Sequence, residues 1–372
     1  MDQYLKNYHA VIRTEGPVFI GSGKEIGKKE YLFINEHQAG ILDIQKFYQE
    51  MSQRKKAGEL ETYLLGTSGS DLNLWLRKQK INTNEIRHMF KYTLDCTDAV
   101  IERGKKQVLE CIKDPYGNPY VPGSSLKGML RTILLGSDII KHPAKYQRSR
   151  NSLKRNTLKT SGRNTYLSRD ISQIEATAFR TLARERTEPG DAVNDVLQGC
   201  KISDSAPLSL SSLVLCQSVE LHTNGVEKTL PIFRECIMPG IDIHFDITID
   251  TKICSLSIQT LMDAVSRFAQ HYYQSFASAF PGAAQLKKNH VLLGGGCGFA
   301  SKTILYPMYG KKEGIETTQQ VFKITLGKNF KIHKHDQDRE IGVSPHILKC
   351  TKYKGKTLQI GLCRIVKIHP NV

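Results

Sequence analysis

Several features that mark common protein classes are missing from this sequence of 372 residues. No apolar run approaches the roughly 20 residues that a membrane-spanning helix needs, and the charged start followed by a strand-like pattern is unlike a signal peptide. The nine cysteines include no C-x-x-C pair, and their odd number argues against a disulfide framework and against a zinc ribbon. There is also no repeat of about 20–50 residues. We therefore expect a cytoplasmic globular protein with reduced thiols and no membrane association.

Nucleotide-binding fingerprints are missing as well. The segment "IGSGKEIGKK" (20–29) has the wrong spacing for a phosphate-binding P-loop, and "LLGGGCGFASKT" (292–303) lacks the acidic residue expected after a dinucleotide-binding loop. ATP hydrolysis is therefore not expected, and we predict neither a cofactor nor a bound metal. Catalytic candidates are weak and comprise His9, His333 and His335.

The run "KIHKHDQD" (331–338) places His333 and His335 two residues apart, beside Asp336 and Asp338. In a strand, both histidines would share a face and could bind a metal or act as bases. Such a run is more often a solvated loop, and we favour that interpretation. His9 falls in a predicted strand, where we interpret it as an ordinary strand residue.

What the sequence does have is an excess of positive charge. The formal net charge is +17 and the pI is about 9.4, which favours a polyanionic partner such as nucleic acid. Residues 201–300 hold 7 basic and 8 acidic side chains, whereas residues 301–372 hold 14 and 5. Between Ile139 and Arg169 there are nine Lys and Arg residues and no acid. Because this stretch has few apolar anchors, it indicates a mobile insertion rather than core.

The hydrophobic pattern predicts an α+β fold. A helical period predicts helices at 41–51, 71–78 (with Asp71 as N-cap), 124–135, 170–182 and 258–276. Alternation predicts strands at 8–12 and 18–20, and a three-stranded antiparallel meander at 213–221, 226–236 and 241–250, whose first turn is Asn224-Gly225. We divide the chain into an N-terminal domain, 1–200, with the basic insertion 139–169, and a C-terminal α+β domain, 201–372, with the glycine-rich loop 294–298.

The stretch "YVPGSSLKGMLRTIL" (120–134) predicts a helix with an unusual start. A proline–glycine pair leads into it, and Ser124 or Ser125 can cap it. Lys127 and Arg131 are four residues apart and lie on the same side. A helix N-terminus beside a lysine can bind a phosphate. The alternative, slightly favoured on this stretch alone, is a core helix whose two cations point to water.

Two glycine-rich loops strengthen the case for a phosphate site. They span 20–29 and 292–303, and each follows an apolar, strand-like run. Glycine lets a backbone approach a ligand closely and exposes N–H groups that can surround an anion. Either loop taken alone could equally be a tight turn.

Together these segments resemble the RAMP superfamily of CRISPR-associated proteins. The blocks that carry the resemblance span most of the chain and are "YHAVIRTEGPVFIGSGKEI" (8–26), "YVPGSSLKGMLRT" (120–132), "ISDSAP" (202–207) and "LLGGGCGFASKT" (292–303). Their order, and the length of the chain, are most similar to the RAMP subunit that caps the 3′ end of the guide RNA in type III-A Csm effector complexes.

The resemblance implies a ferredoxin-like (RRM-like) core with a thumb-like insertion, for which 139–169 is our candidate. It also implies a non-catalytic subunit of an antiviral complex that binds crRNA, stacks beside the multi-copy backbone subunit and other Csm subunits, shares the particle with target RNA, and supports crRNA maturation. Because the aromatic RNP signature is missing, we expect contacts to the RNA backbone rather than base stacking. The residues expected to bind RNA are Gly21, Ser22, Gly23, Gly123, Ser124, Ser125, Lys127, Arg131, Lys145, Arg148, Arg150, Lys154, Arg155, Gly294, Gly295, Gly296, Gly298 and Lys302.

Two other functions stay open. An endoribonuclease that itself trims crRNA would need general acid–base residues, for which only the three histidines named above are candidates. A protein-only scaffold subunit would contact its neighbours without touching RNA, and it would leave the charge of 139–169 unexplained.

Overall fold

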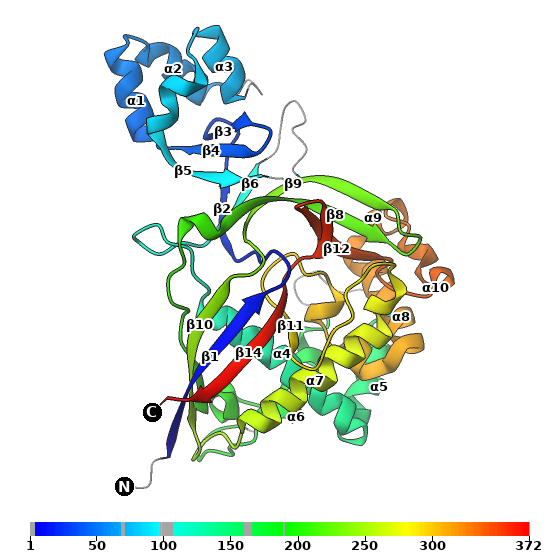
Figure 1. Ribbon diagram of the computed structural model, residues 1–372. Helices are drawn as coiled ribbons and strands as arrows, with labels where there is room; N and C mark the ends of the chain where they lie inside the picture. Colours follow the sequence, from blue (N-terminus) through cyan, green and yellow to red (C-terminus); the bar gives the residue numbers. More distant parts are fainter. Residues whose placement is uncertain are drawn as a thin grey trace.

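Two β-sheets organise the computed structural model, which describes residues 4–67, 71–96, 98, 107–159, 166–188 and 190–371 (Figure 1). The smaller sheet is antiparallel, and its strands in spatial order are β11 (His290–Leu292), β14 (Leu362–Pro370), β1 (Leu5–Thr14), β10 (Asp242–Asp250) and β7 (Cys200–Ile202). The larger sheet follows the order β2 (Gly21–Ile26), β6 (Val108–Cys111), β9 (Glu227–Ile237), β8 (Leu213–His222), β5 (Phe90–Asp95), β4 (Gln38–Leu42) and β3 (Tyr31–Asn35). Two further strands extend it from β8, namely β12 (Ile347–Tyr353) and β13 (Lys356–Gln359).

Helices pack against these sheets, which confirms the α+β class. They are α1 (Ile44–Gln53), α2 (Ala57–Leu65), α3 (Leu72–Lys78), α4 (Gly123–Lys141), α5 (Gln147–Asn156), α6 (Ser168–Phe179), α7 (Ile258–Ser275), α8 (Leu305–Leu326), α9 (Asn329–Ile332) and α10 (Asp338–Ile341). In the part of the chain that the structure describes, none of them has both the length and the apolarity needed to cross a bilayer.

The main core lies between the smaller sheet and helices α4 and α7 and continues into the larger sheet, where it includes Leu215 of β8 and Phe233 of β9. Strand β10 shows the predicted alternation, because its isoleucines and Phe245 are buried while the side chains between them reach the surface. Helix α7 shows the predicted helical stripe, which is buried at Leu261, Val265, Phe268 and Tyr272. Leu126, Leu130 and Ile133 of α4 join the same core as Phe245 and Val265.

The predicted meander is correct for two strands and wrong for the third. β8 and β9 form the predicted hairpin and Gly225 has φ 82°, but Asn224 lacks the positive φ that a type I′ Asn-Gly turn needs at both central positions. β10 leaves this hairpin and pairs with β1 and β7 in the smaller sheet. Both sheets therefore contain strands from either side of residue 200, and the predicted domain division does not follow the boundary between the sheets.

The described residues between 31 and 95, namely 31–67 and 71–95, form a lobe that projects from the body (Figure 1). The lobe has its own hydrophobic cluster, in which the ring of Trp75 packs edge-on against Phe47 at 5.9 Å. Asp71 is the N-cap of α3, as predicted, since its carboxylate accepts a hydrogen bond from the Leu74 N–H. The first predicted helix begins later than expected, because Ile41 belongs to β4.

The basic stretch 139–169 is not a mobile insertion over its described residues, which leave out 160–165. Helices α4, α5 and α6 pass through it, and Tyr146 and Leu153 are fully buried in the main core. These two apolar side chains, two helical turns apart, are enough to anchor a short helix of otherwise polar residues. The interpretation from composition alone is therefore wrong for this stretch.

All nine cysteines are unpaired, as their number and spacing predict, and all of them are buried. Burial raises the pKa of the Cys96 and Cys350 thiols to about 12. These thiols are therefore protonated packing groups rather than nucleophiles.

Glu235 on β9 has a fully buried carboxylate in the larger sheet. It accepts hydrogen bonds from the Lys113 ammonium (2.6 Å), the Tyr92 hydroxyl (2.6 Å) and the Cys111 N–H (3.0 Å). Tyr92 lies on β5, Cys111 ends β6 and Lys113 follows it. A buried carboxylate is tolerated when it is paired and hydrogen-bonded, so this group ties three parts of the sheet together.

We predict that Glu235→Ala lowers the free energy of unfolding by about 3–5 kcal/mol, because it leaves the Lys113 ammonium, 11% exposed, without its buried partner. Denaturant titration of both proteins measures the difference. Lys46→Ala is the control: its ammonium is 61% exposed and 3.7 Å from Asp43, so the change should stay below about 1 kcal/mol. Equal effects of the two substitutions would contradict the role of Glu235.

Candidate nucleic-acid interface

Three segments that are far apart in the sequence supply all but one of the residues that line a pocket of about 420 Å³, the exception being Phe268 of α7. One wall comes from the start of β2, another from α4, and the third from the loop 292–302. Five of the predicted RNA-binding residues meet in this lining, namely Gly21, Ser125, Gly294, Gly295 and Lys302. The remaining lining residues are Ile20, Gly128, Met129, Thr132, Ile133, Phe268, Leu292 and Ser301.

The glycine loop 294–298 is held against the chain before β2. The Gly295 N–H donates to the Phe19 carbonyl at 2.6 Å, and the two residues form a β-bridge. Gly294 has φ +88°, and a Cβ on it would lie 2.3 Å from the Phe19 carbonyl oxygen. Gly296 and Gly298 also have positive φ, at +79° and +91°. Only glycine can combine these dihedral angles with so close an approach, which explains why the loop is rich in it.

The first glycine-rich segment is a strand rather than the predicted loop. Gly21, Ser22 and Gly23 belong to β2, which pairs with β6 across a register shift. Ser22 donates to the Glu110 carboxylate at 3.2 Å, and Gly23 is exposed with φ +83°. Only Gly21 of the three lines the pocket.

The start of α4 differs from the prediction in the group that caps it. Neither Ser124 nor Ser125 makes a side-chain cap; Pro122 is the N-cap residue, and the Gly123 N–H donates to the Asp204 carboxylate at 2.7 Å. Asp204 belongs to the "ISDSAP" block, so the chain itself places an anion at this helix N-terminus. The Gly123 amide is therefore already hydrogen-bonded within the chain, and its contact with RNA stays a prediction.

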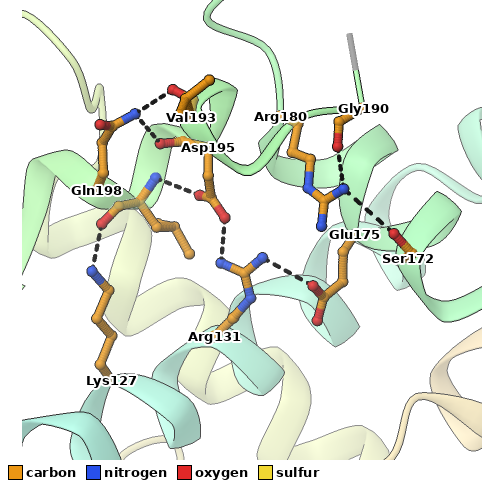
Figure 2. A network of polar contacts seen from close by, with 10 residues as sticks. Lys127, Arg131, Ser172, Glu175, Arg180, Gly190, Val193, Asp195 and Gln198 are labelled. Carbon is orange, nitrogen blue, oxygen red and sulfur yellow. Dashed lines mark hydrogen bonds and ion pairs between the residues drawn. The ribbon is translucent and has the colours of Figure 1, made fainter. Parts of the chain in front are cut away.

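Lys127 and Arg131 lie on the same side of α4, as predicted, and both contact the segment 195–197 (Figure 2). The Lys127 ammonium donates to the Leu197 carbonyl at 2.8 Å. Arg131 donates to Asp195 at 2.7 Å and to Glu175 at 3.1 Å. Burial tends to lower the pKa of the Arg131 guanidinium, but the two carboxylates outweigh it and the net shift is upward. Contact of these two cations with RNA stays a prediction.

Cations of the basic stretch pair with acids that lie outside it or at its edge. Lys145 donates to Asp138 at 2.7 Å, and Arg150 donates to Glu313 on α8 at 2.8 Å. Lys154 reaches the same Glu313 carboxylate at 3.4 Å. Arg148 and Arg155 are exposed and form no ion pair with any described residue. Part of the local charge is therefore neutralised within the fold.

Lys302 differs from these paired cations. Its side chain is exposed at the rim of the pocket, and within the described ranges its ammonium has no carboxylate partner. Lys302 and Thr132 also line a second, more apolar pocket of about 340 Å³, to which Arg131 contributes. Sequence reasoning missed Gly128 and Thr132 as lining residues, although a glycine inside a helix was a signal for Gly128.

The structure brings two of the three catalytic candidates close to each other, since the His333 and His335 rings lie 6.4 Å apart, whereas His9 lies in the smaller sheet. His9 on β1 contacts Asp246 at 3.0 Å and His244 at 3.1 Å. His333 is exposed at the end of α9. The "KIHKHDQD" run is not the solvated loop that we favoured, because His335 is buried.

Similarity to known proteins places the chain in a family. The RAMP superfamily profile matches residues 11–298. The CRISPR system Cms protein Csm5 of Mycobacterium tuberculosis (strain H37Rv) is 30% identical, covering 98% of both chains, and the Csm5 protein of Streptococcus thermophilus is 26% identical, covering 94% of this chain and 99% of that one. The chain therefore belongs to the RAMP superfamily, and within it to the family of Csm5 proteins.

Solved structures show the same fold. A chain in the cryo-EM structure of a type III-A Csm–crRNA–target RNA ternary complex aligns with a TM-score of 0.62 at 18% identity, covering 96% of this chain and all (100%) of that one. The crystal structure of T. onnurineus Csm5 aligns with a TM-score of 0.58 at 16% identity, covering 95% and 100%. These alignments extend the likeness over nearly the whole chain.

We predict that Gly294→Ala destabilises the protein by about 3 kcal/mol or more, because it adds a clash with the Phe19 carbonyl to an unfavourable φ. Gly282→Ala is the matched control, since Gly282 has φ +78° with open space where the added methyl group would lie. It should cost only about 1–2 kcal/mol for the dihedral angle. Thermal or denaturant unfolding compares them, and equal losses would show that the close approach to Phe19 carries no energy.

Proposed function

We propose that this protein is the crRNA-binding RAMP subunit of a type III-A Csm antiviral complex. In this proposal it caps the 3′ end of the crRNA and supports crRNA maturation and assembly of the complex without cleaving RNA itself. Its partners are crRNA, the adjacent multi-copy backbone subunit and other Csm subunits, with target RNA in the same particle. Family membership supports the assignment, as does the likeness to a chain of a Csm complex that contains crRNA and target RNA.

The observation that carries the RNA-binding part is the pocket between β2, α4 and the loop 292–302. Its lining joins glycines, the Ser125 and Thr132 hydroxyls and the Lys302 ammonium, which has no carboxylate partner among the described residues. Such groups bind phosphate and sugar oxygens rather than base edges. Recognition of the backbone suits a subunit that must accept guides of any sequence.

The finer features of the fold are part of the proposal. We assign the ferredoxin-like core to the smaller sheet with α4 and α7 on its inner face. A thumb-like role for 139–169 would act through Arg148 and Arg155, since Lys145, Arg150 and Lys154 already have carboxylate partners.

We predict that Lys302→Ala weakens guide RNA binding about 3–10-fold at low salt without changing the melting temperature, because the exposed ammonium has no carboxylate partner in the described chain. Loss of one phosphate contact should also reduce the slope of log K against log salt by about 0.7. Fluorescence titration of labelled crRNA over a range of salt concentrations measures both quantities. An unchanged affinity and slope would remove Lys302 from the interface.

Gly128→Leu tests the pocket without removing charge. Gly128 lies inside α4 with open space around its Cβ position, so leucine should raise helix stability by up to about 1 kcal/mol. The same side chain should narrow the pocket and reduce crRNA affinity by about tenfold or more. Gly58→Leu is the matched control, because Gly58 is also an exposed helical glycine with open space, on α2 of the projecting lobe. A stable Gly128→Leu protein with unchanged RNA binding would refute the pocket as the RNA site.

One observation favours the endoribonuclease as the second candidate. His9 bonds to the Asp246 carboxylate through Nδ1 and to His244 through Nε2, an arrangement that can orient an imidazole for proton transfer. Incubating the protein with labelled precursor crRNA, with and without a chelator, separates the functions. Cleavage that His9→Ala abolishes would replace the non-catalytic proposal.

A further inference from the structure

Three metal-ligating side chains meet in the protein interior beside helix α8. His335, Asp338 and His346 each offer one ligand atom, and these atoms lie within 4.8 Å of one another. His335 is 6% exposed, Asp338 0% and His346 7%. None of them lines the pocket between β2, α4 and the loop 292–302.

The three residues come from three different local structures. His335 opens a 3₁₀ turn, His335–Gln337, directly after Lys334 in the left-handed region at φ 57°. Asp338 begins α10, and His346 immediately precedes β12. The sequence pattern could pair His335 only with its neighbours, and it offered no reason to select His346.

The charge of the Asp338 carboxylate is what makes the cluster unusual. Its oxygens lie 2.5 Å from His346 Nδ1, 3.1 Å from His335 Nδ1 and 2.6 Å from the Ser344 hydroxyl. Among the described residues, no lysine or arginine forms an ion pair with it. Burying a carboxylate without a permanent cation beside it costs folding free energy, and a positively charged group bound to the carboxylate reduces that cost.

We propose that His335, Asp338 and His346 bind one divalent transition-metal ion, with zinc as the best match. Two imidazole nitrogens and a carboxylate form a mixed nitrogen–oxygen set, which zinc prefers and which calcium and magnesium do not. Ligands at about 2.0–2.2 Å from zinc lie roughly 3.3 Å apart, so the observed carboxylate–imidazole separations of 2.5 and 3.1 Å need to change by less than about 1 Å. The two histidine ligand atoms lie within 4.8 Å of each other, so their separation needs to change by about 1.5 Å at most. The Ser344 hydroxyl or a water molecule can complete four-coordination.

The surroundings fit a structural rather than a catalytic metal. The Phe322 ring of α8 packs 4.7 Å from His335, and Gln319 of the same helix donates to the His335 carbonyl at 2.9 Å. The Tyr306 hydroxyl donates to the Ser344 carbonyl at 2.7 Å. Such contacts fix the orientation of the ligands. A metal here would join the 3₁₀ turn His335–Gln337 and the start of α10 to the residue that precedes β12, and β12 pairs with β8 in the larger sheet.

The experiment uses the full-length protein and Zn²⁺ alone. We expect about one equivalent of zinc per chain by elemental analysis, either as purified or after adding Zn²⁺ and dialysing. Free Zn²⁺ at 100 times its Kd should multiply the folded-to-unfolded ratio about 100-fold, and a chelator should lower the melting temperature. His335→Gln and His346→Gln, which keep a polar side chain, should lose both effects.

His222→Gln is the matched control, because the His222 ring lies 5.8 Å from that of His346 but is outside the ligand set. It should keep both the zinc and the chelator response. If the glutamine variants fail to fold, Co²⁺-loaded wild-type protein should show the visible absorption of a four-coordinate site. A wild-type protein that takes up no zinc or cobalt, and melts at the same temperature with Zn²⁺ and with chelator, would show that the cluster is a metal-free hydrogen-bond network. RNA binding at the pocket does not depend on either outcome.

Discussion

The arrangement of this protein depends on places where backbone contacts backbone, or a buried side chain, without room for a Cβ atom. A Cβ atom built on Gly16 would lie 2.0 Å from the Gln359 carbonyl oxygen, and one on Gly123 would lie 2.2 Å from the Ile202 carbonyl oxygen. A Cβ atom on Gly294 would lie 2.3 Å from the Phe19 carbonyl oxygen, and one on Gly361 would lie 2.1 Å from the Cys297 sulfur. These contacts join segments that are separated by tens to hundreds of residues. The Gly294 contact holds the glycine loop against Phe19, just before β2, and the Gly123 contact holds the start of α4 against the end of β7. The start of β2, helix α4 and the glycine loop all contribute to the pocket lining.

The same arrangement determines which charges are available to a ligand. The net charge of +17 suggests a strongly basic surface, yet several of the cations selected from the sequence are already paired. Arg131 lies between Asp195 and Glu175, and Arg150 contacts Glu313. Lys302 has no carboxylate partner among the described residues and stands at the rim of the pocket. A strand bound there would meet peptide groups, hydroxyls and one cation on a flexible stem, and we expect these polar groups to contact the RNA backbone rather than the bases. The rest of the lining is apolar and consists of Ile20, Met129, Ile133, Phe268 and Leu292.

Local signals in the sequence predicted local structure well. The alternation of β10, the stripe of α7, the Asp71 cap and the Asn224-Gly225 turn each depend on neighbouring residues, and each is present. The errors concern contacts between distant segments. Nothing near β10 reveals that β1 is its partner, and nothing near Gly123 reveals that Asp204 accepts its hydrogen bond.

The candidate site was also predicted only in part: its segments were identified from the sequence, but the side chains that face the pocket were not. The sequence alone identified the segments that line the pocket. Glycine-rich loops allow a close approach of the backbone, and a helix start with serine and lysine can bind an anion, and both patterns are visible in short stretches of sequence. Which side chains of those segments face the pocket was decided by tertiary packing. Ser125 faces it, whereas Lys127 turns to the Leu197 carbonyl. His346, which completes the buried cluster with His335 and Asp338, was also beyond the reach of local pattern.

Residue-level crosslinking of crRNA in the assembled particle tests the central claim most directly. We expect crosslinks in the three segments that line the pocket, 20–21, 125–133 and 292–302, with the RNA backbone rather than a preferred base sequence determining their position. Crosslinks confined to the projecting lobe 31–95 or to the outer face of the smaller sheet, with the pocket segments unmodified, would contradict it.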